Sequence, residues 1–548
     1  MDQKTHKPTG LDLMTRKREE DNTVLRKKKR EKKLGQRRGY GIEQSNEPVV
    51  DVEQLIVKYN PIAMVKANDF QQLSLLNSIL CVIYNSNREM TPYYHRLFGR
   101  SQQDGNIIMH YLLATTCASP GSDQSNLAIG CLVNLTASVR SECGDFIVAG
   151  LLSCNFAKIA NQILSTPSTP LPTHHLLWKV VFNVAYTSRE ARNELFASPL
   201  FQTNTFMVAL NQPLMRQIII PVLSEMIGGI DDQEDGSVRA YYPILPRTFV
   251  FTVWPRVLDS LLLLDMQDTS KAQQDVVYCA IRIMRQVLVE YGDQYEDLRQ
   301  LFSTNADTLR VLHHLVDYYR FSERARYYIV KLMFEFSKGR VPDGPKIMIT
   351  CNFATLLMLA HQSKYKEQRI SAVKCINNIL TDGMPSIKQL VELRVVERCF
   401  VPLLERDNLE VQRHVCNAIG DLIGMCATVA TVDSSHFLRY ILLSQRIFKH
   451  VIKFVTPSNP IETVATVLQM FIDVLSWDTN VGKEALESVS DMKFITALMQ
   501  SQNAELYKMA AKIDGLWHNN METDDDESNL VFPELAPSGP GVYVGGFL

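Results

Sequence analysis

Apolar residues recur at helical spacing along most of this chain. From about residue 50 to residue 518 they form blocks of roughly 12–18 residues, separated by polar residues or by Pro and Gly. No alternation typical of strands competes with this spacing. The pattern therefore predicts an all-α array whose helices each pack an apolar face against their neighbours.

The blocks also repeat one another. Each sets a single polar residue among small and apolar residues, and this position falls at Asn134, Asn183, Glu225, Glu335, Asn378, Asp421 and Asp473. The steps between these positions are 49, 42, 110, 43, 43 and 52, and the long step has room for one more block near Met284–Leu288. A period in the low to mid forties is that of an armadillo or HEAT unit. We expect about ten units, the first near Leu73–Tyr84 and the last near Glu505–Trp517.

A unit of this size cannot bury its apolar face alone, so neighbouring units stack into a superhelix with one long concave groove. We expect a right-handed alpha-alpha superhelix of armadillo repeats over residues 50–518. Residues 1–48 have the composition of a flexible basic arm, and residues 519–548 that of a disordered acidic tail. The residues around Asp231–Ala240 look like a loop insertion in the array.

Charge is divided unevenly along the chain. The formal net charge is −2, yet residues 1–40 hold 14 Lys or Arg and 6 Asp or Glu, leaving 43 basic and 53 acidic residues in the remainder. A basic arm on an acidic body can attach to an acidic protein, to nucleic acid or to its own body, or can simply be solvated. The composition alone leaves these alternatives open.

The detailed sequence of the arm favours the acidic protein. The segment from Arg16 to Arg38 closely resembles the importin-beta-binding domain of importin-alpha proteins, in the order and spacing of its basic residues and in its interspersed acidic residues. An acidic stretch from Glu522 to Glu527 also resembles the importin-alpha C-terminus. The resemblance assigns importin-beta binding to Arg16, Lys17, Arg18, Val24, Leu25, Arg26, Lys27, Lys29, Arg30, Lys33, Leu34, Arg37 and Arg38.

The resemblance also implies a mechanism. Importin-alpha proteins hold cargo with a basic nuclear localisation signal in the groove, while importin-beta holds the arm and carries the complex. Without importin-beta, the basic end of the arm, here Gln36–Arg38, occupies the groove in place of the signal. An export receptor recovers the adaptor through its C-terminal region, here near Asp524, Asp525 and Asp526. Such a protein shuttles between cytoplasm and nucleus.

The groove departs from the family pattern. Family members place a Trp four residues before each ladder Asn, on the same helix face, where the rings stack on Lys side chains. This chain has no such Trp column; the corresponding residues are Gly130, Lys179, Pro221, Met284, Lys331, Lys374, Asn417 and Gln469. Trp178 lies five residues before Asn183, about 140° from it on a helix, so we expect it in the core.

Three of the replacing residues, Lys179, Lys331 and Lys374, would repel a basic peptide, so we do not expect tight binding of ordinary basic signals. The candidate cargo-groove residues are Asn134, Asn183, Glu225, Glu335, Asn378, Asp421 and Asp473. Contact with cargo and hydrogen bonding between stacked helices explain this column equally well. The function indicated is a nuclear import adaptor. The alternative is a scaffold or decoy that binds importin-beta without carrying basic-signal cargo.

Catalysis and cofactors are not indicated. Gly339–Gly344 has the glycine spacing of a phosphate loop, but its Lys is displaced, no Ser or Thr follows and no strand precedes it. His174–His175 and His313–His314 are adjacent pairs, which point apart on a helix, and Cys residues are scattered singly. We therefore expect no enzyme activity, metal or cofactor, no direct nucleic-acid binding, buried reduced cysteines and no membrane insertion.

Overall fold

The computed structural model describes residues 51–518, with gaps at residues 87–89, 100–101, 138–142, 188, 203, 228–230, 233–237, 240–244, 269, 293–294, 381, 430, 457–458 and 489–492. Within these residues the chain is helical apart from one pair of two-residue strands, so the all-α prediction is confirmed. The chain divides into two compact units, residues 1–355 (unit 1) and residues 356–548 (unit 2).

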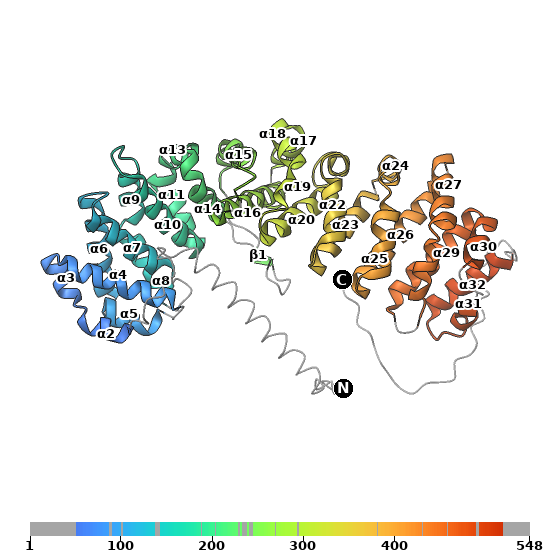
Figure 1. The fold of residues 1–548 in the computed structure, drawn as a ribbon, viewed down its shortest axis with the longest axis horizontal. Helices are drawn as coiled ribbons and strands as arrows, with labels where there is room; N and C mark the ends of the chain where they lie inside the picture. Colours follow the sequence, from blue (N-terminus) through green and yellow to red (C-terminus); the bar gives the residue numbers. More distant parts are fainter. Residues whose placement is uncertain are drawn as a thin grey trace, which may run out of the picture. The chain divides into compact units, whose positions relative to one another are not determined.

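Unit 1 is built on six long helices, each of which packs against the next (Figure 1). We call them the unit-1 row helices. Every second to fourth helix of the unit belongs to this row. The row consists of α4 (Phe70–Asn85), α7 (Asp123–Ala137), α10 (Leu171–Thr187), α14 (Arg216–Met226), α16 (Lys271–Gln286) and α20 (Glu323–Ser337).

The other helices of unit 1 pack beside the row and close its apolar core. They are α2 (Val52–Lys58), α3 (Pro61–Ala67), α5 (Thr91–Phe98), α6 (Gln102–Ala118), α8 (Gly144–Ser153), α9 (Phe156–Leu164), α11 (Arg189–Ala197), α12 (Pro199–Gln202), α13 (Thr205–Asn211), α15 (Arg247–Leu262), α17 (Glu296–Thr304), α18 (Ala306–His313), α19 (Leu315–Tyr318) and α21 (Gly344–Ile347). Helix α22 (Phe353–Gln362) spans the division between the units. Short 3₁₀ or π turns occur at Pro213–Met215, Val287–Tyr291 and Met348–Asn352.

An insertion interrupts the row between α14 and α15, where the sequence predicts a loop. It contains strands β1 (Asp231–Asp232) and β2 (Val238–Arg239), which pair antiparallel with Asp231 opposite Arg239. The residues that flank the insertion on both sides hydrogen-bond to the side chain of Tyr291. Its hydroxyl donates to the carbonyl oxygen of Ile227 at 3.4 Å and accepts from the backbone N–H of Leu245 at 3.2 Å.

Unit 2 repeats the arrangement with four row helices in succession: α23 (Lys366–Leu380), α26 (Leu409–Val429), α29 (Ile461–Trp477) and α32 (Ala504–His518). Beside them lie α24 (Met384–Glu392), α25 (Val401–Arg406), α27 (Val432–Arg439), α28 (Ile447–Val451), α30 (Thr479–Glu487) and α31 (Lys493–Leu498). Short turns occur at Val396–Phe400, Tyr440–Ser444 and Ile452–Phe454. With the six row helices of unit 1, the described residues hold ten row helices, in agreement with the prediction of about ten repeats.

The cores of both units are apolar and hold the chain's largest rings. Trp178 is fully buried, with its ring 5.9 Å from that of Phe206, as the helical angle predicts. Trp254 is also buried, and its indole N–H donates to Thr308 Oγ1 at 3.1 Å. All eleven cysteines are free, and all but Cys117 and Cys351 are buried, as expected for structural thiols.

Within the described residues, no single helix has the length and apolarity to span a membrane. Two helix pairs reach the length and apolarity of a membrane span only when both helices of the pair are counted together, and each pair is sharply bent at its junction. They are Phe146–Ser153 with Phe156–Leu164, and Thr205–Asn211 with Pro213–Met226.

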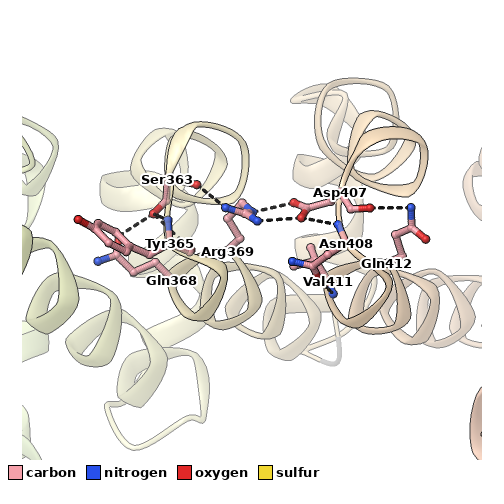
Figure 2. A network of polar contacts seen from close by, with 8 residues as sticks. All are labelled: Ser363, Tyr365, Gln368, Arg369, Asp407, Asn408, Val411 and Gln412. Atoms are coloured by element: carbon pink, nitrogen blue, oxygen red, sulfur yellow. Dashed lines mark hydrogen bonds and ion pairs between the residues drawn. The ribbon is translucent and has the colours of Figure 1, made fainter. Parts of the chain in front are cut away.

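In unit 2, a polar clamp fixes one row helix to the start of the next (Figure 2). The guanidinium of Arg369 in α23 donates twice to Asp407, at 2.6 and 2.8 Å, and once to the carbonyl oxygen of Ser363 at 2.7 Å. Asp407 and Asn408 precede α26, and Asn408 Oδ1 accepts from the backbone N–H of Val411. Because the side chains of Arg369 and Asp407 are only 16% and 9% exposed, this bidentate pair joins successive repeats away from most solvent.

We predict that Asp407→Ala destabilises unit 2 by about 3 kcal/mol, because it leaves the Arg369 guanidinium largely buried without its carboxylate. The thermal unfolding midpoint of the full chain, followed by circular dichroism, measures this. Glu410→Ala is the matched control, since Glu410 pairs with Lys366 beside the clamp but in solvent, and its midpoint should equal that of the wild type. Equal midpoints for both variants would contradict a stabilising role for the clamp.

Candidate functional site

The predicted polar column lies on the row helices. Asn134, Asn183, Glu225 and Glu335 belong to α7, α10, α14 and α20 of unit 1. Asn378, Asp421 and Asp473 belong to α23, α26 and α29 of unit 2. The predicted importin-beta-binding residues, from Arg16 to Arg38, and Asp524, Asp525 and Asp526 lie outside the described residues.

The two asparagines of unit 1 face the preceding row helix. Asn134 is 1% exposed, and its amide donates to Cys81 Sγ at 3.2 Å. Asn183 is fully buried, and its amide donates to the carbonyl oxygen of Val133 at 3.2 Å and to Thr136 Oγ1 at 3.1 Å. Of the two roles that the sequence left open, this geometry matches the hydrogen bond between stacked helices.

Glu225 forms a buried ion pair with the next row helix. Its Oε1 accepts from Arg282 Nη1 at 2.8 Å, and the two side chains are 11% and 7% exposed. The same Arg282 nitrogen also donates to Ser224 Oγ at 3.1 Å. The pair therefore joins α14 to α16, and the carboxylate is neutralised inside the stack.

The carboxylate of Glu335 pairs with cations that follow it closely in the chain. Its side chain is 8% exposed, Arg340 Nε lies 3.1 Å from its Oε2 and Lys338 Nζ lies 4.0 Å away. Arg340 also donates to the carbonyl oxygen of Val289, at the end of the preceding repeat. In unit 1, then, both acidic column residues pair with arginines that the sequence reading did not single out.

Unit 2 leaves its acidic column residues closer to solvent. Asp421 is exposed and accepts a hydrogen bond from Asn377 Nδ2 at 2.6 Å. Asp473 is half-buried and accepts from Gln469 Nε2 at 2.6 Å. Burial raises the pKa of the Asp473 carboxyl, while the Gln469 bond and the charge of Lys512 act against that shift. Asn378 is half-buried.

Glycine on α26 makes room for one of these carboxylates. A Cβ at Gly424 would lie 3.2 Å from Asp473 Oδ2, and one at Gly420 would lie 3.0 Å from Thr466 Cγ2. Helices α26 and α29 can therefore approach closely, with the Asp473 carboxylate against the α26 backbone. The open face of these two helices combines acidic and amide groups, which can pair with cations and hydrogen-bond a peptide backbone.

The residues that occupy the positions of the Trp column differ in their exposure to solvent. Lys374, Asn417 and Gln469 of unit 2 are exposed. In unit 1, Lys179 is half-buried, and burial followed by the nearby charge of Lys271 lowers the pKa of its ammonium group.

The block between α14 and α20 carries apolar residues where the others carry a polar one. Met284 and Leu288, near which the spacing predicts this block, are fully buried. Arg282, two residues before Met284, pairs with the column residue Glu225.

Within the described residues, no three His, Cys, Asp or Glu side chains gather as metal ligands do. Cys351 Sγ lies 3.2 Å from His313 Nε2, a pair that supplies only two ligands. The phosphate-loop-like segment Gly339–Gly344 contains Asp343 as the N-cap of the four-residue helix α21, and its Lys346 pairs with Asp343 at 2.8 Å.

Comparisons with known proteins bear on both parts of the chain. Residues 3–91 match the family model described as the importin beta binding domain, which extends past the predicted arm into the first helices of unit 1. The search of curated proteins found no match.

Among solved structures, an engineered protein of the Northeast Structural Genomics Consortium is similar with a TM-score of 0.54 and 14% identity, over 86% of this chain and 99% of that one. A designed armadillo repeat protein in complex with the peptide (KR)4 has a TM-score of 0.38 and 18% identity, over 48% and 98%. UNC-45 from Drosophila melanogaster has a TM-score of 0.37 and 10% identity, over 82% and 55%. At 14% identity, the similarity to the engineered protein shows only that the two chains share a helical-repeat fold.

We predict that Glu225→Ala destabilises unit 1 by about 3 kcal/mol, because Arg282 remains buried without its counter-charge. The double variant Glu225→Met/Arg282→Met should recover most of this loss, since it removes both charges and keeps comparable volume. Hydrogen exchange of α14 and α16 amides measures both effects. If the double variant were no more protected than the single one, the pair would not be the cause.

Proposed function

We propose that this chain, whose residues 3–91 match the importin beta binding domain, is an importin-alpha-like adaptor that links protein cargo to importin-beta and shuttles between cytoplasm and nucleus. The observation that carries the proposal is the match of residues 3–91 to the importin beta binding domain, followed by the stacked row helices. Both parts are binding elements rather than catalytic ones. The arm supplies a cationic ligand for importin-beta, and the array supplies a long surface for a second partner.

The proposal includes competition between the arm and cargo. Residues 1–40 carry an excess of 8 basic residues and the rest of the chain an excess of 10 acidic ones, so the arm is attracted to the body when importin-beta is absent. In unit 2, Asp421 and Asp473 offer carboxylates with which Gln36–Arg38 or a cargo signal can pair. Such exposed contacts are weak and salt-sensitive, which allows one partner to displace the other.

A second candidate function is an importin-beta-binding scaffold or decoy that carries no basic-signal cargo. Two observations favour it. No Trp stands in the column that would hold Lys side chains, and the amides of Asn134 and Asn183 donate to the neighbouring row helices. Each missing Trp forfeits about 0.5–2 kcal/mol of cation–π attraction. The two functions share the arm and differ only in what the array binds.

We predict that deleting residues 1–45 abolishes binding of the chain to importin-beta in a pull-down. Within the full chain, Arg26→Ala/Arg30→Ala should weaken that binding at least tenfold, because each arginine makes a charge-assisted contact with an acidic partner. Lys158→Ala/Lys508→Ala removes the same charge from exposed positions outside residues 3–91 and should change affinity less than threefold. Tight binding after the deletion would refute the function.

We also predict that the chain lacking residues 1–45 binds a standard basic-signal peptide more weakly than about 10 µM, because the Trp slots are missing. Asp421→Asn/Asp473→Asn should remove the remaining affinity, whereas Glu487→Gln, a change on α30, should not. Fluorescence titration measures both. Micromolar or tighter binding would exclude the decoy and establish the array as a signal receptor.

A further inference from the structure

A thiol and an imidazole from distant parts of the chain meet in unit 1. Cys351 Sγ lies 3.2 Å from His313 Nε2, a distance at which the thiol and the ring nitrogen share a hydrogen bond. His313 is the last residue of α18, and Cys351 belongs to the π turn Met348–Asn352, which packs against that helix. His314, the neighbour of His313 in sequence, pairs instead with Asp317 at 3.0 Å.

The pair is open to solvent. His313 is exposed, and Cys351 is half-buried, between exposed Thr350 and buried Asn352. A small reagent dissolved in water can therefore reach the edge of the turn where the sulfur lies. Cys117 is half-buried as well, but the described residues include no hydrogen bond from a histidine to its thiol.

No carboxylate in the described part of the chain pairs with His313. The acidic residues closest to it in sequence are Asp307 and Asp317, and they pair with Arg310 at 3.1 Å and with His314 at 3.0 Å. The Nε2 atom of His313 is therefore available to the thiol, and an imidazolium formed there would have the thiolate as its counter-charge.

An imidazole beside a thiol can make cysteine a nucleophile. Burial alone raises the pKa of the Cys351 thiol, which would keep it protonated at neutral pH. Transfer of its proton to His313 Nε2 gives a thiolate next to an imidazolium, and the attraction between these charges acts against the effect of burial. His313 thus supplies what a half-buried thiol lacks.

The buried cysteines are protected from the same chemistry. Cys399, Cys416 and Cys426 are buried, and burial raises the pKa of each of these thiols to about 12, so almost no thiolate forms at neutral pH. Their sulfur atoms are also shielded from dissolved reagents by the apolar core. Cys351 combines access with a base, whereas Cys117 has access alone.

We propose that Cys351 is a site of oxidation by hydrogen peroxide, with His313 as the base that accepts its proton. The sulfur attacks one peroxide oxygen, the O–O bond breaks, and the departing hydroxide takes the proton from His313 Nε2 and leaves as water. The sulfur is oxidised by two electrons to a sulfenic acid, and the peroxide is reduced. The reaction depends on neither importin-beta binding nor cargo transport.

The test first measures how fast Cys351 of the full chain reacts with iodoacetamide. Trypsin releases residues 347–364, which contain no other cysteine, so mass spectrometry follows this thiol by itself. At pH 7, Cys351 should react about fivefold faster than Cys117, because the imidazolium increases its thiolate fraction. His313→Gln should lower the Cys351 rate about fivefold and leave the Cys117 rate unchanged.

His314→Gln is the matched control, since it removes the neighbouring imidazole, and it should change neither rate. Between pH 7 and pH 5, the Cys351 rate should fall less steeply in the wild type than in His313→Gln, because the imidazolium keeps part of the thiol ionised. A purely structural role for His313 would leave this pH profile unchanged. Both histidines are exposed, so circular dichroism should be the same for all three proteins.

The second measurement adds hydrogen peroxide together with dimedone, which traps sulfenic acids. Residues 347–364 should be labelled equally in the wild type and in His314→Gln, and about fivefold less in His313→Gln. Equal Cys351 rates in the wild type and His313→Gln would overturn the proposal. So would faster labelling of Cys117 than of Cys351, or the absence of dimedone on residues 347–364.

Discussion

The structure depends on the contact between each row helix and the next. One repeat of about forty residues has too little apolar surface to fold alone, so its stability is shared with its neighbours. A buried polar residue on the contacting faces needs a hydrogen-bonding or charged partner, and several find that partner across the junction. Asn134, Asn183 and Glu225 do so, through Cys81, Val133 and Arg282 respectively. The same requirement explains why Arg369 and Asp407 are placed to join two successive repeats.

This requirement limits what the array can bind. A side chain that satisfies a neighbouring helix has fewer hydrogen-bond donors or acceptors left for a ligand. In unit 1 the polar column is largely used in this way. In unit 2 the column residues Asp421 and Asp473 remain nearer to solvent. Each unit therefore offers a different kind of partner surface, although both come from the same repeat.

Carrier binding and ligand binding follow from different parts of the chain. The match to the importin beta binding domain covers residues 3–91, most of which precede the row helices. The array surface is encoded by which residues its repeats leave exposed, and substitutions there can change the partner without affecting the carrier. A chain of this organisation can therefore lack the Trp column and still carry the sequence that matches the importin beta binding domain.

Much of the fold was predictable from the sequence. The helical spacing of apolar residues, with one polar residue in most blocks, predicted about ten repeats. Each predicted block lies on a row helix, because stacked units share one period. The five-residue offset of Trp178 placed it in the core, since helix geometry alone decides that angle. The order of charged residues in the arm indicated its partner. Like the helical angle of Trp178, this order is a local property of the chain that can be determined without the tertiary structure.

Tertiary structure decided the roles of individual polar residues. Whether Asn183 faces a ligand or Thr136 depends on the neighbouring repeat, and its sequence distance from Thr136 carries no signal about their contact. The pairing of Arg282 with Glu225 likewise appears only when α14 and α16 stack. Spacing along one helix is fixed by its backbone, whereas contacts between helices are fixed by packing.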